Sequence, residues 1–182
     1  MKQETIAVTG VSGVGKTTLL QRLAKLIDFQ HVTGGSLIAT ARNAPLEARD
    51  VIRYDNLDEN QRLLIEGFVL TRDQNSNLVI MDGHVVIDDG NRLSNISSEV
   101  FRALGVSVMV HLESEPERIA ANRRGDTSRS RPFYPSDILG QHQAISRAQA
   151  KAVADILGIP FHIVTHNDTE QLARLLVARQ PL

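Results

Sequence analysis

The chain has 182 residues, of which 42% are hydrophobic and 23% are charged, and its formal net charge is −1. This length favours a single domain with its own apolar core over residues 1–182. The near-neutral charge argues against a general nucleic-acid-binding surface. The sequence contains no cysteine, which excludes disulfides and thiolate zinc sites. No apolar run approaches the ~18 residues of a membrane span, so we expect a cytoplasmic protein without a membrane partner.

The most informative pattern follows the first predicted strand, an apolar and β-branched run over residues 5–9. Residues 10–17 read GVSGVGKT, which matches the phosphate-binding pattern G-x-x-x-x-G-K-S/T. A helix is expected to follow, because apolar residues recur at helical spacing at Leu19, Leu20, Leu23, Leu26 and Ile27. The sequence therefore predicts a strand, a phosphate-binding loop and a helix, and a bound nucleoside triphosphate. An incidental glycine-rich turn is the alternative.

Each part of this loop has a predicted role. Its glycines let backbone N–H groups point at the β-phosphate, and the following helix adds the positive end of its dipole. Lys16 is expected to bridge the β- and γ-phosphates, and the Thr17 hydroxyl is expected to bind Mg²⁺. The predicted ATP-binding residues are Gly10, Gly13, Val14, Gly15, Lys16, Thr17 and Thr18.

The next region is interpreted as an insert that binds an acceptor. A second strand is expected over residues 29–32, with a turn after it and a helix from about Ser36. The predicted insert covers about residues 36–72; it carries Arg42, Arg49 and Arg53, before a further helix over 61–72. Because this segment is too long for a simple crossover, its arginines are interpreted as ligands of an acceptor phosphate. Surface ion pairs are the alternative role for them.

The third predicted strand, residues 78–82, is an apolar run that ends in Asp82. Beside a phosphate-binding loop, a carboxylate at a strand end can reach the Mg²⁺ held by Thr17, directly or through water. The sequence therefore predicts Asp82 as a second Mg²⁺ ligand, with an ordinary turn residue as the alternative.

Four further elements are expected in the middle of the chain. A hairpin with a polar tip is predicted over residues 85–91, a helix over 97–104 and a fourth strand over 106–112. Residues 114–117 read SEPE, which predicts a capping box with proline in the first turn of a helix. That helix is expected to end near Gly125.

A group of arginines lies around the loop that begins with Gly125 and ends at Pro135. Its members are Arg118, Arg123, Arg124, Arg129 and Arg131. We interpret the segment from about 123 to 135 as an arginine lid that neutralises charge and excludes water during phosphoryl transfer. A solvated charge run is one alternative, and a nucleic-acid patch that stacks bases on Phe133 and Tyr134 is another.

The last part of the chain completes the predicted fold. A long helix is expected over residues 136–157, closed by Gly158, and a fifth strand over 161–164. Residues 167–170 read NDTE and are expected to cap a final helix that ends near Arg179.

Five apolar strands that alternate with helices predict an α/β three-layer sandwich with a five-stranded parallel sheet. This is the P-loop type of nucleoside-triphosphate-binding fold. Ligands in such folds bind at the carboxyl ends of the strands. Gly10, Thr33, Asp82 and Asn167 are expected to lie there.

Several of these motifs resemble one family, the nucleoside monophosphate kinases, and within it the archaeal type of adenylate kinase. The resemblance includes residues 8–18 around the loop and residues 81–84, which read MDGH. Arg129-Ser130-Arg131 with QHQ at 141–143 and SRA at 146–148 is similar to that family's R-x-R, E-H-Q and N-R-A pattern. Residues 49–53, which read RDVIR, are similar to its R-D-x-x-R segment.

The resemblance implies a five-stranded core with two mobile pieces, transfer between MgATP and AMP, and a homo-oligomer that is often trimeric. The predicted catalytic residues are Lys16, Arg123, Arg129 and Arg131, and the predicted metal ligands are Thr17 and Asp82. The predicted acceptor-binding residues are Thr33, Ser36, Arg49, Arg53 and His84. Residues 33–36 read TGGS and Phe-Pro-Arg does not follow Asp82-Gly83, unlike in the common adenylate kinases, so another monophosphate stays open.

Three functions are compatible with these patterns. The leading one is a nucleoside monophosphate kinase that uses MgATP. A kinase for another small metabolite is the second, because related small kinases share the loop, the sheet and the lid. The third is a nucleotide-dependent switch or a nucleic-acid-associated ATPase, whose activity would depend on RNA or DNA and on salt.

Overall fold

The computed structural model describes residues 3–44, 58–127 and 132–179. Its centre is a five-stranded, all-parallel sheet in the order β2-β3-β1-β6-β7. The strands are β1 (Glu4–Thr9), β2 (Gln30–Thr33), β3 (Leu78–Asp82), β6 (Val106–Leu112) and β7 (Phe161–Val164). The predicted α/β fold with a five-stranded parallel sheet is confirmed.

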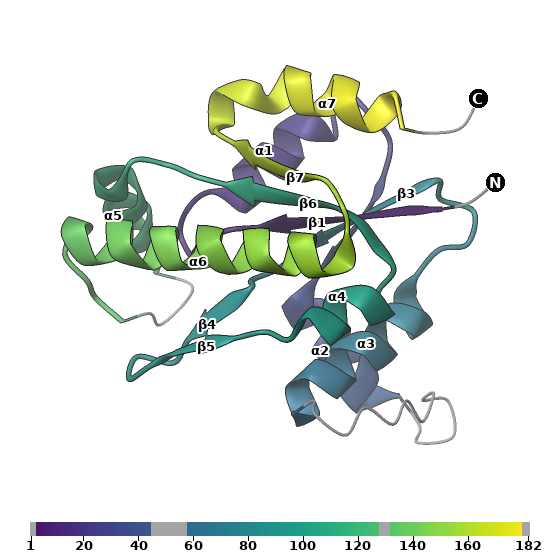
Figure 1. Ribbon diagram of the computed structural model, residues 1–182, viewed down its shortest axis with the longest axis horizontal. Coiled ribbons are helices and arrows are strands. Elements are labelled where there is room, and N and C mark those ends of the chain that lie inside the picture. The colour runs from purple at the N-terminus through teal and green to yellow at the C-terminus, as the bar shows by residue number, and fades with distance from the viewer. Residues whose placement is uncertain (1–2, 45–57, 128–131, 180–182) are drawn as a thin grey trace.

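Helices cover both faces of this sheet. They are α1 (Lys16–Leu23), α2 (Gly34–Asn43), α3 (Glu59–Thr71), α4 (Ser98–Ala103), α5 (Pro116–Gly125), α6 (Ser136–Leu157) and α7 (Thr169–Val177), with a 3-10 turn, η2 (His166–Asp168), before α7. Figure 1 shows α1 and α7 on one side of the sheet and α6, α4, α3 and α2 on the other. A separate antiparallel hairpin, β4 (Val86–Asp88) and β5 (Leu93–Asn95), lies below α6 in this view.

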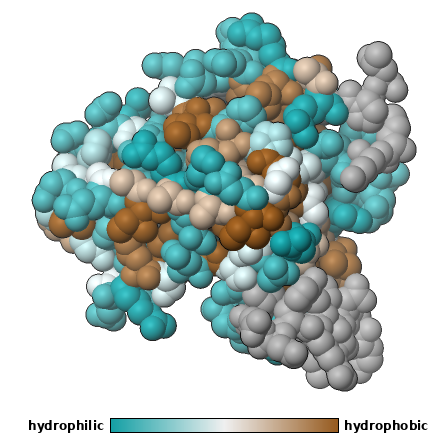
Figure 2. All heavy atoms as spheres, viewed as in Figure 1, coloured by the Kyte–Doolittle hydropathy of each residue, from teal (hydrophilic) through white to brown (hydrophobic). Residues whose placement is uncertain are grey.

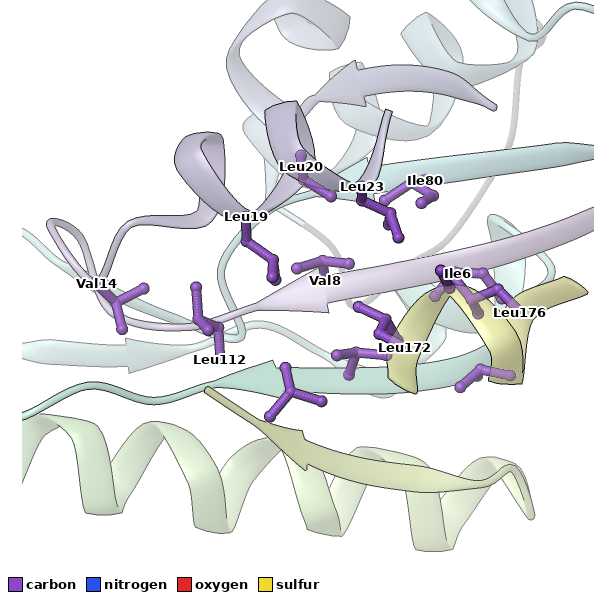
Figure 3. Close-up of a cluster of buried hydrophobic side chains, with 14 of the residues drawn as sticks. Ile6, Val8, Val14, Leu19, Leu20, Leu23, Ile80, Leu112, Leu172 and Leu176 are labelled. Atoms are coloured by element: carbon purple, nitrogen blue, oxygen red, sulfur yellow. The ribbon is translucent and has the colours of Figure 1, made fainter. Parts of the chain in front are cut away.

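The sheet divides the core into two clusters because successive strand residues point to opposite faces. On the face covered by α1 and α7, Ile6 and Val8 of β1 pack with Leu19, Leu23 and Leu172 (Figure 3). On the opposite face, other residues of β1, β3 and β6 pack against α2, α3, α4 and α6. Both layers are therefore anchored on the strands whose carboxyl ends carry the predicted site.

Two predicted helix starts differ from the structure. The capping box at residues 114–117 is wrong: α5 begins at Pro116 with no side-chain cap. The Gln143 side chain instead accepts from Ser114 N–H at 3.1 Å and donates to Ser114 C=O at 3.0 Å. At the last helix, Thr165 and Asp168 form a capping box around the 3-10 turn, and the following helix has no side-chain cap.

The first helix is shorter than predicted. It ends at Leu23, and turns follow it, so Leu26 is 50% exposed instead of buried. Figure 2 shows apolar side chains interspersed with hydrophilic ones on the face seen there. Among the described residues, no helix is both long and apolar enough to cross a membrane.

Candidate active site

The carboxyl ends of β1, β2 and β3 meet at one edge of the sheet, since Thr33 and Val8 both pair in register with Asp82. A cleft of about 880 Å³, called here the larger cleft, opens at this edge. The predicted site residues that line it are Gly13, Gly15, Lys16, Thr17, Thr18, Thr33, Asp82 and His84. The structure therefore brings together the predicted loop, the strand-end carboxylate and part of the predicted acceptor site.

The phosphate-binding loop, residues 10–17, follows β1 and leads into α1. Gly10, Gly13 and Gly15 have φ values of +153°, +87° and +100°, which side-chain-bearing residues rarely adopt. A Cβ atom on Gly15 would lie 2.6 Å from the imidazole of His166, and one on Gly13 would lie 2.7 Å from Cγ of Arg123. Glycine is thus required at these positions both by the backbone and by the side chains packed against it.

Side chains from distant parts of the chain hold the carbonyl oxygens of this loop. Asn122 Nδ2 donates to Gly13 C=O at 2.9 Å, and His166 Nε2 donates to Val14 C=O at 2.9 Å. Arg123 Nε donates to Ser12 C=O at 2.8 Å. We call Asn122, Arg123 and His166 the loop braces.

Gly10 C=O accepts from two predicted site residues. Lys16 Nζ donates to it at 3.1 Å, and His84 Nδ1 donates to it at 2.9 Å. With the braces, four carbonyls of the loop are bonded to side chains of the protein. These contacts hold the loop through its carbonyl oxygens, and its backbone N–H groups can donate to phosphate oxygens.

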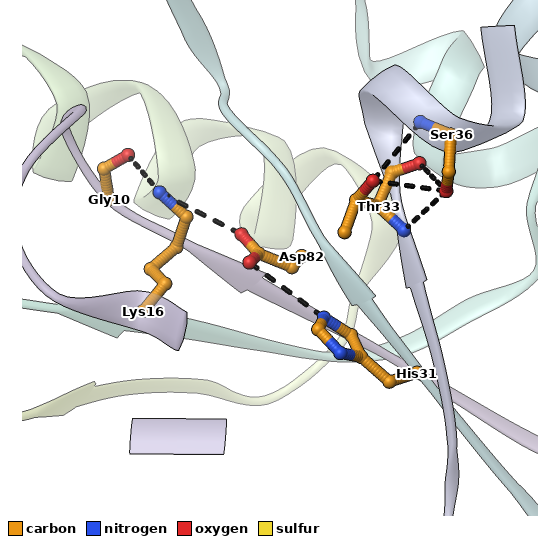
Figure 4. A network of polar contacts seen from close by, with 6 residues as sticks. All are labelled: Gly10, Lys16, His31, Thr33, Ser36 and Asp82. Carbon is orange, nitrogen blue, oxygen red and sulfur yellow. Dashed lines mark hydrogen bonds and ion pairs between the residues drawn. The ribbon is translucent and has the colours of Figure 1, made fainter. Parts of the chain in front are cut away.

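A chain of titratable groups crosses the larger cleft. Lys16 Nζ lies 3.8 Å from Asp82 Oδ1, and His31 Nε2 lies 3.8 Å from Asp82 Oδ2 (Figure 4). Burial raises the pKa of Asp82, but the adjacent His31 imidazole and the electrostatic effect of Lys16 and His84 outweigh burial and keep this pKa below its ordinary value. Asp82 is therefore a carboxylate at neutral pH, at the point where the loop meets the rest of the cleft.

Thr33 and Ser36 lie at the start of α2, where the hydroxyl oxygen of each residue accepts a hydrogen bond from the backbone N–H of the other. Thr33 Oγ1 accepts from Ser36 N–H at 3.1 Å, and Ser36 Oγ accepts from Thr33 N–H at 3.1 Å (Figure 4). The pair forms a capping box that satisfies N–H groups at the helix start. Thr33 lines the larger cleft and Ser36 does not.

Beyond this helix start, the larger cleft is mainly apolar. Its wall is formed by Ile38 of α2, Leu64 of α3, Met81 of β3, and Ile87 and Ile96 of the hairpin region. The predicted acceptor ligands Arg49 and Arg53 and the predicted lid residues Arg129 and Arg131 lie outside the described residues. Their roles stay predictions.

A smaller cleft of about 250 Å³ lies between the hairpin and α6. It shares Ser12, His84 and Ile87 with the larger cleft, so the two clefts adjoin beside the phosphate-binding loop. Arg123, Asp88 and His142 supply further polar groups to its wall. No motif in the sequence predicted the smaller cleft.

His111, at the end of β6, is a buried histidine that sequence reasoning placed only among core or loop residues. Its Nδ1 lies 3.0 Å from Thr9 Oγ1, which itself donates to Val110 C=O. Within the part of the chain that the structure describes, its Nε2 has no partner. Burial, followed by the charges of Lys16 and Arg147, lowers the pKa of His111 to about 4. The imidazole is therefore neutral beneath the phosphate-binding loop at physiological pH.

Sequence reasoning also missed His31, Asn122 and His166. His31 is two residues before Thr33 on β2, and residues two apart in a strand point to the same face. This spacing from a predicted site residue could have indicated that His31 lies at the site. Asn122 and His166 reach the loop from 109 and 152 residues away. No spacing in the sequence points to them.

The chain is similar to one protein family and to several curated proteins. The model of the AAA domain family matches residues 9–137. The adenylate kinase of Thermoplasma acidophilum is 29% identical over 164 residues, which covers 88% of both chains. That of Thermoplasma volcanium is 30% identical over 165 residues, which covers 88% of this chain and 90% of its relative.

The fold has a similar solved counterpart. Shikimate kinase from Acinetobacter baumannii, in complex with shikimate, superposes with a TM-score of 0.59 at 15% identity, and the alignment covers 100% of this chain and 97% of that one. At this identity the match concerns the fold alone. The family match and the curated relatives go further, because the family model includes the phosphate-binding loop and each curated relative covers 88% of the chain. The chain belongs to the AAA domain family, is a relative of the archaeal adenylate kinases, and is an ATP-dependent phosphotransferase.

Proposed function

We infer that this phosphotransferase is a nucleoside monophosphate kinase that transfers the γ-phosphoryl group of MgATP to AMP. The curated relatives named adenylate kinase support this acceptor class. The observation that carries the proposal is the larger cleft, in which one hollow connects Lys16 and Thr17 with Asp82, Thr33 and Leu64. Its volume of about 880 Å³ lies in the upper part of the range for ligand pockets.

The donor end of the cleft suits a magnesium-bound triphosphate. Loop N–H groups and Lys16 would hold the β- and γ-phosphates. Thr17 and Asp82 both line the cleft, and a hydroxyl with an ionised carboxylate is the hard oxygen donor set that Mg²⁺ prefers. Thr17 and Asp82 would hold Mg²⁺, whose chemistry there is to neutralise charge on the phosphate oxygens.

The acceptor end suits a planar apolar group attached to a phosphate. Ile38, Leu64 and Ile96 offer apolar surface to a base, while Asp82 and His84 lie toward the phosphate-binding loop. Arg49 and Arg53 remain the proposed ligands of the acceptor phosphate. The acceptor would thus be held with its phosphate toward the donor and its base toward α2 and α3.

The reaction is an in-line displacement. An oxygen of the acceptor phosphate attacks the γ-phosphorus, the bond between that phosphorus and the β–γ bridging oxygen breaks, and ADP leaves with the electron pair. No general base is needed, because the acceptor phosphate is already ionised. Catalysis then depends on positioning and on charge neutralisation, by Lys16 and by Arg123, Arg129 and Arg131 of the proposed lid.

The test is ADP formation from MgATP with AMP, CMP, GMP and UMP in separate assays. The wild type is compared with Lys16→Ala, which removes the phosphate-binding cation. Lys25→Ala, a change to an exposed lysine just after α1, is the matched control. We expect AMP-dependent turnover that falls by roughly 10³-fold in Lys16→Ala and is unchanged in Lys25→Ala.

Other outcomes would change the proposal in specific ways. Preference for a different monophosphate would keep the enzyme class and change the acceptor. Turnover only with a small non-nucleotide metabolite would favour the second hypothesis. Slow hydrolysis that no acceptor accelerates, but that RNA or DNA stimulates in a salt-dependent manner, would reject the kinase proposal in favour of a nucleic-acid-associated ATPase.

A further inference from the structure

Tyr134, in the segment between α5 and α6, contacts three separate elements. Its hydroxyl donates to Asp88 Oδ1 of β4 at 3.1 Å. Its ring meets that of His142 on α6 edge to face, with centroids 4.8 Å apart and an interplanar angle of 73°. The guanidinium carbon of Arg123 on α5 lies 5.9 Å from the centre of the Tyr134 ring, within cation–π range. One side chain thus connects the hairpin, α5 and α6.

Arg123 links this contact to the phosphate-binding loop. Its Nε donates to Ser12 C=O at 2.8 Å, and its Cγ would lie 2.7 Å from a Cβ on Gly13. The side chain is therefore packed along the loop at one end and against the Tyr134 ring at the other. Removal of the ring would take away one of the contacts that restrict the rotamers of the Arg123 guanidinium, although the backbone of α5 would stay in place.

Asp88 fixes the other end of Tyr134. The same oxygen, Oδ1, accepts from Gly90 N–H at 2.9 Å, which ties the carboxylate to the hairpin turn. Its Oδ2 lies 3.9 Å from His142 Nδ1. Burial and the adjacent Asp88 carboxylate raise the pKa of Tyr134, so the phenol stays a neutral donor. The ring orientation is thus set by a hydrogen bond as well as by packing.

The position of these contacts relates them to the reaction. Asp88, Arg123 and His142 line the smaller cleft, which adjoins the larger cleft at Ser12 and His84. A change in this wall therefore alters the space next to the phosphate-binding loop. In phosphoryl transfer, fixed cations and the exclusion of water both favour transfer over hydrolysis.

We propose that Tyr134 is a positioning residue for phosphoryl transfer, which acts by holding Arg123 against the phosphate-binding loop and by joining the loop to the β4–β5 hairpin. This role rests on the proposed function for its effect on transfer. Its effect on the binding of the triphosphate does not depend on the identity of the acceptor. Tyr134 acts through Arg123, whose guanidinium it helps to hold beside the phosphate-binding loop.

The test uses three single variants. Tyr134→Leu removes the aromatic face and keeps apolar bulk, and Tyr134→Phe removes only the hydroxyl. Phe133→Leu is the matched control, because this neighbouring aromatic side chain is 75% exposed. We expect kcat for transfer to fall about tenfold in Tyr134→Leu and about threefold in Tyr134→Phe, and to stay unchanged in Phe133→Leu. The ratio of ATP hydrolysis to transfer should rise in the same order.

A double-mutant cycle with Arg123→Met separates positioning from a general structural effect. If Tyr134 acts through Arg123, Tyr134→Leu causes little further loss in the Arg123→Met background. An undiminished tenfold loss in that background would overturn the proposal. Thermal melting of every variant identifies any that fail to fold, and Tyr134→Phe, which keeps the half-buried ring, is the variant that decides in that case.

A binding measurement separates failure of this inference from failure of the proposed function. The dissociation constant of a non-hydrolysable ATP analogue with Mg²⁺ is measured for the wild type, Tyr134→Leu, Arg123→Met and the double variant. If the wild type transfers to no monophosphate, the proposed function fails. The positioning role is still supported if Tyr134→Leu weakens affinity in the wild-type background but not in the Arg123→Met background. Equal affinities and equal kcat in the wild type and Tyr134→Leu would reject it.

Discussion

The two ends of the larger cleft are built differently. At the donor end, four carbonyl oxygens of the phosphate-binding loop accept hydrogen bonds from side chains, three of them from the loop braces Asn122, Arg123 and His166. At the acceptor end, Thr33 and Ser36 bond to each other, and the wall beyond them is apolar. The two ends also differ in the space beside their glycines. A Cβ on Gly15 would clash with His166, whereas a Cβ on Gly35 would have no atom within 4 Å.

This difference matches what each end is proposed to bind. A triphosphate with its metal presents the same charges in every reaction, and fixed donors that need no rearrangement stabilise the transition state best. An apolar wall contributes affinity for a flat base with little dependence on its hydrogen-bonding edge. The donor end should therefore tolerate few substitutions, and the acceptor end should tolerate many.

The largest expected effect is at Asp82, where the two ends meet. Asp82→Asn removes a proposed metal ligand and the partner of Lys16 and His31. We expect kcat to fall roughly 10³-fold, which corresponds to about 4 kcal/mol of barrier, and the Mg²⁺ requirement to rise. Initial rates over a range of free Mg²⁺ concentrations measure both effects. Asp155→Asn on the exposed face of α6 is the control, and a similar loss there would contradict the assignment.

Alanine at the two contrasting glycines tests the comparison directly. Gly15→Ala places a side chain at a φ of +100° and against His166, so we expect a loss of roughly 3 kcal/mol in unfolding free energy and much weaker ATP binding. Gly35→Ala lies in open space at the start of α2 and should change stability by no more than about 0.5 kcal/mol. Urea unfolding and nucleotide titration of both variants supply the measurement. Equal effects at both positions would remove the contrast.

His111 makes the region beneath the loop sensitive to pH. Its pKa is about 4 in the folded protein against an ordinary value of 6.5, so the unfolded chain binds more protons between these values. Stability is therefore lost as the pH falls from 6.5 towards 4, by about 2 kcal/mol at pH 5. Urea unfolding of the wild type and His111→Gln at pH 7.5 and pH 5 measures this. The variant should lose less stability on acidification, and an identical loss in both proteins would exclude His111 as the source.

A modest effect is expected at Thr33, at the acceptor end of the larger cleft. Thr33→Ala removes the cap of α2 and should lower the unfolding free energy by about 1 kcal/mol, whereas Thr33→Ser should retain it. Because the hydroxyl is engaged in the cap, we expect the acceptor KM to rise no more than a few fold. A much larger rise in Thr33→Ala, restored in Thr33→Ser, would show that the hydroxyl also binds the acceptor.

The features that could be predicted from the sequence are those with a local signal. The loop has a fixed pattern of glycine, lysine and threonine, and Asp82 stands at the end of an apolar run, so their shared position followed from the parallel sheet alone. The capping box at residues 114–117 had an equally local signal and was wrong. There, Gln143 from α6 occupies both backbone groups of Ser114, which no local pattern could reveal.

The parts that could not be predicted depend on long-range contacts. The braces Asn122 and His166 are polar residues in ordinary positions of a helix and a turn, and only the folded chain brings them to the loop. The same holds for Tyr134, which the sequence offered only as a base-stacking residue. Tertiary packing determines these roles, and the hydrophobic periodicity of a single helix or strand does not predict them.

The distance along the chain between the loop and its braces has a consequence for folding. The phosphate-binding loop lies near the amino terminus, yet His166, the last of its braces, is separated by 152 residues from the carbonyl it holds. A chain emerging from the ribosome would carry the complete nucleotide-binding pattern long before it could hold that loop in shape. Closure of such a long segment is slow and entropically costly. Nucleotide binding should therefore be a late event in folding, and bound nucleotide should in turn stabilise the carboxyl-terminal strand and turn.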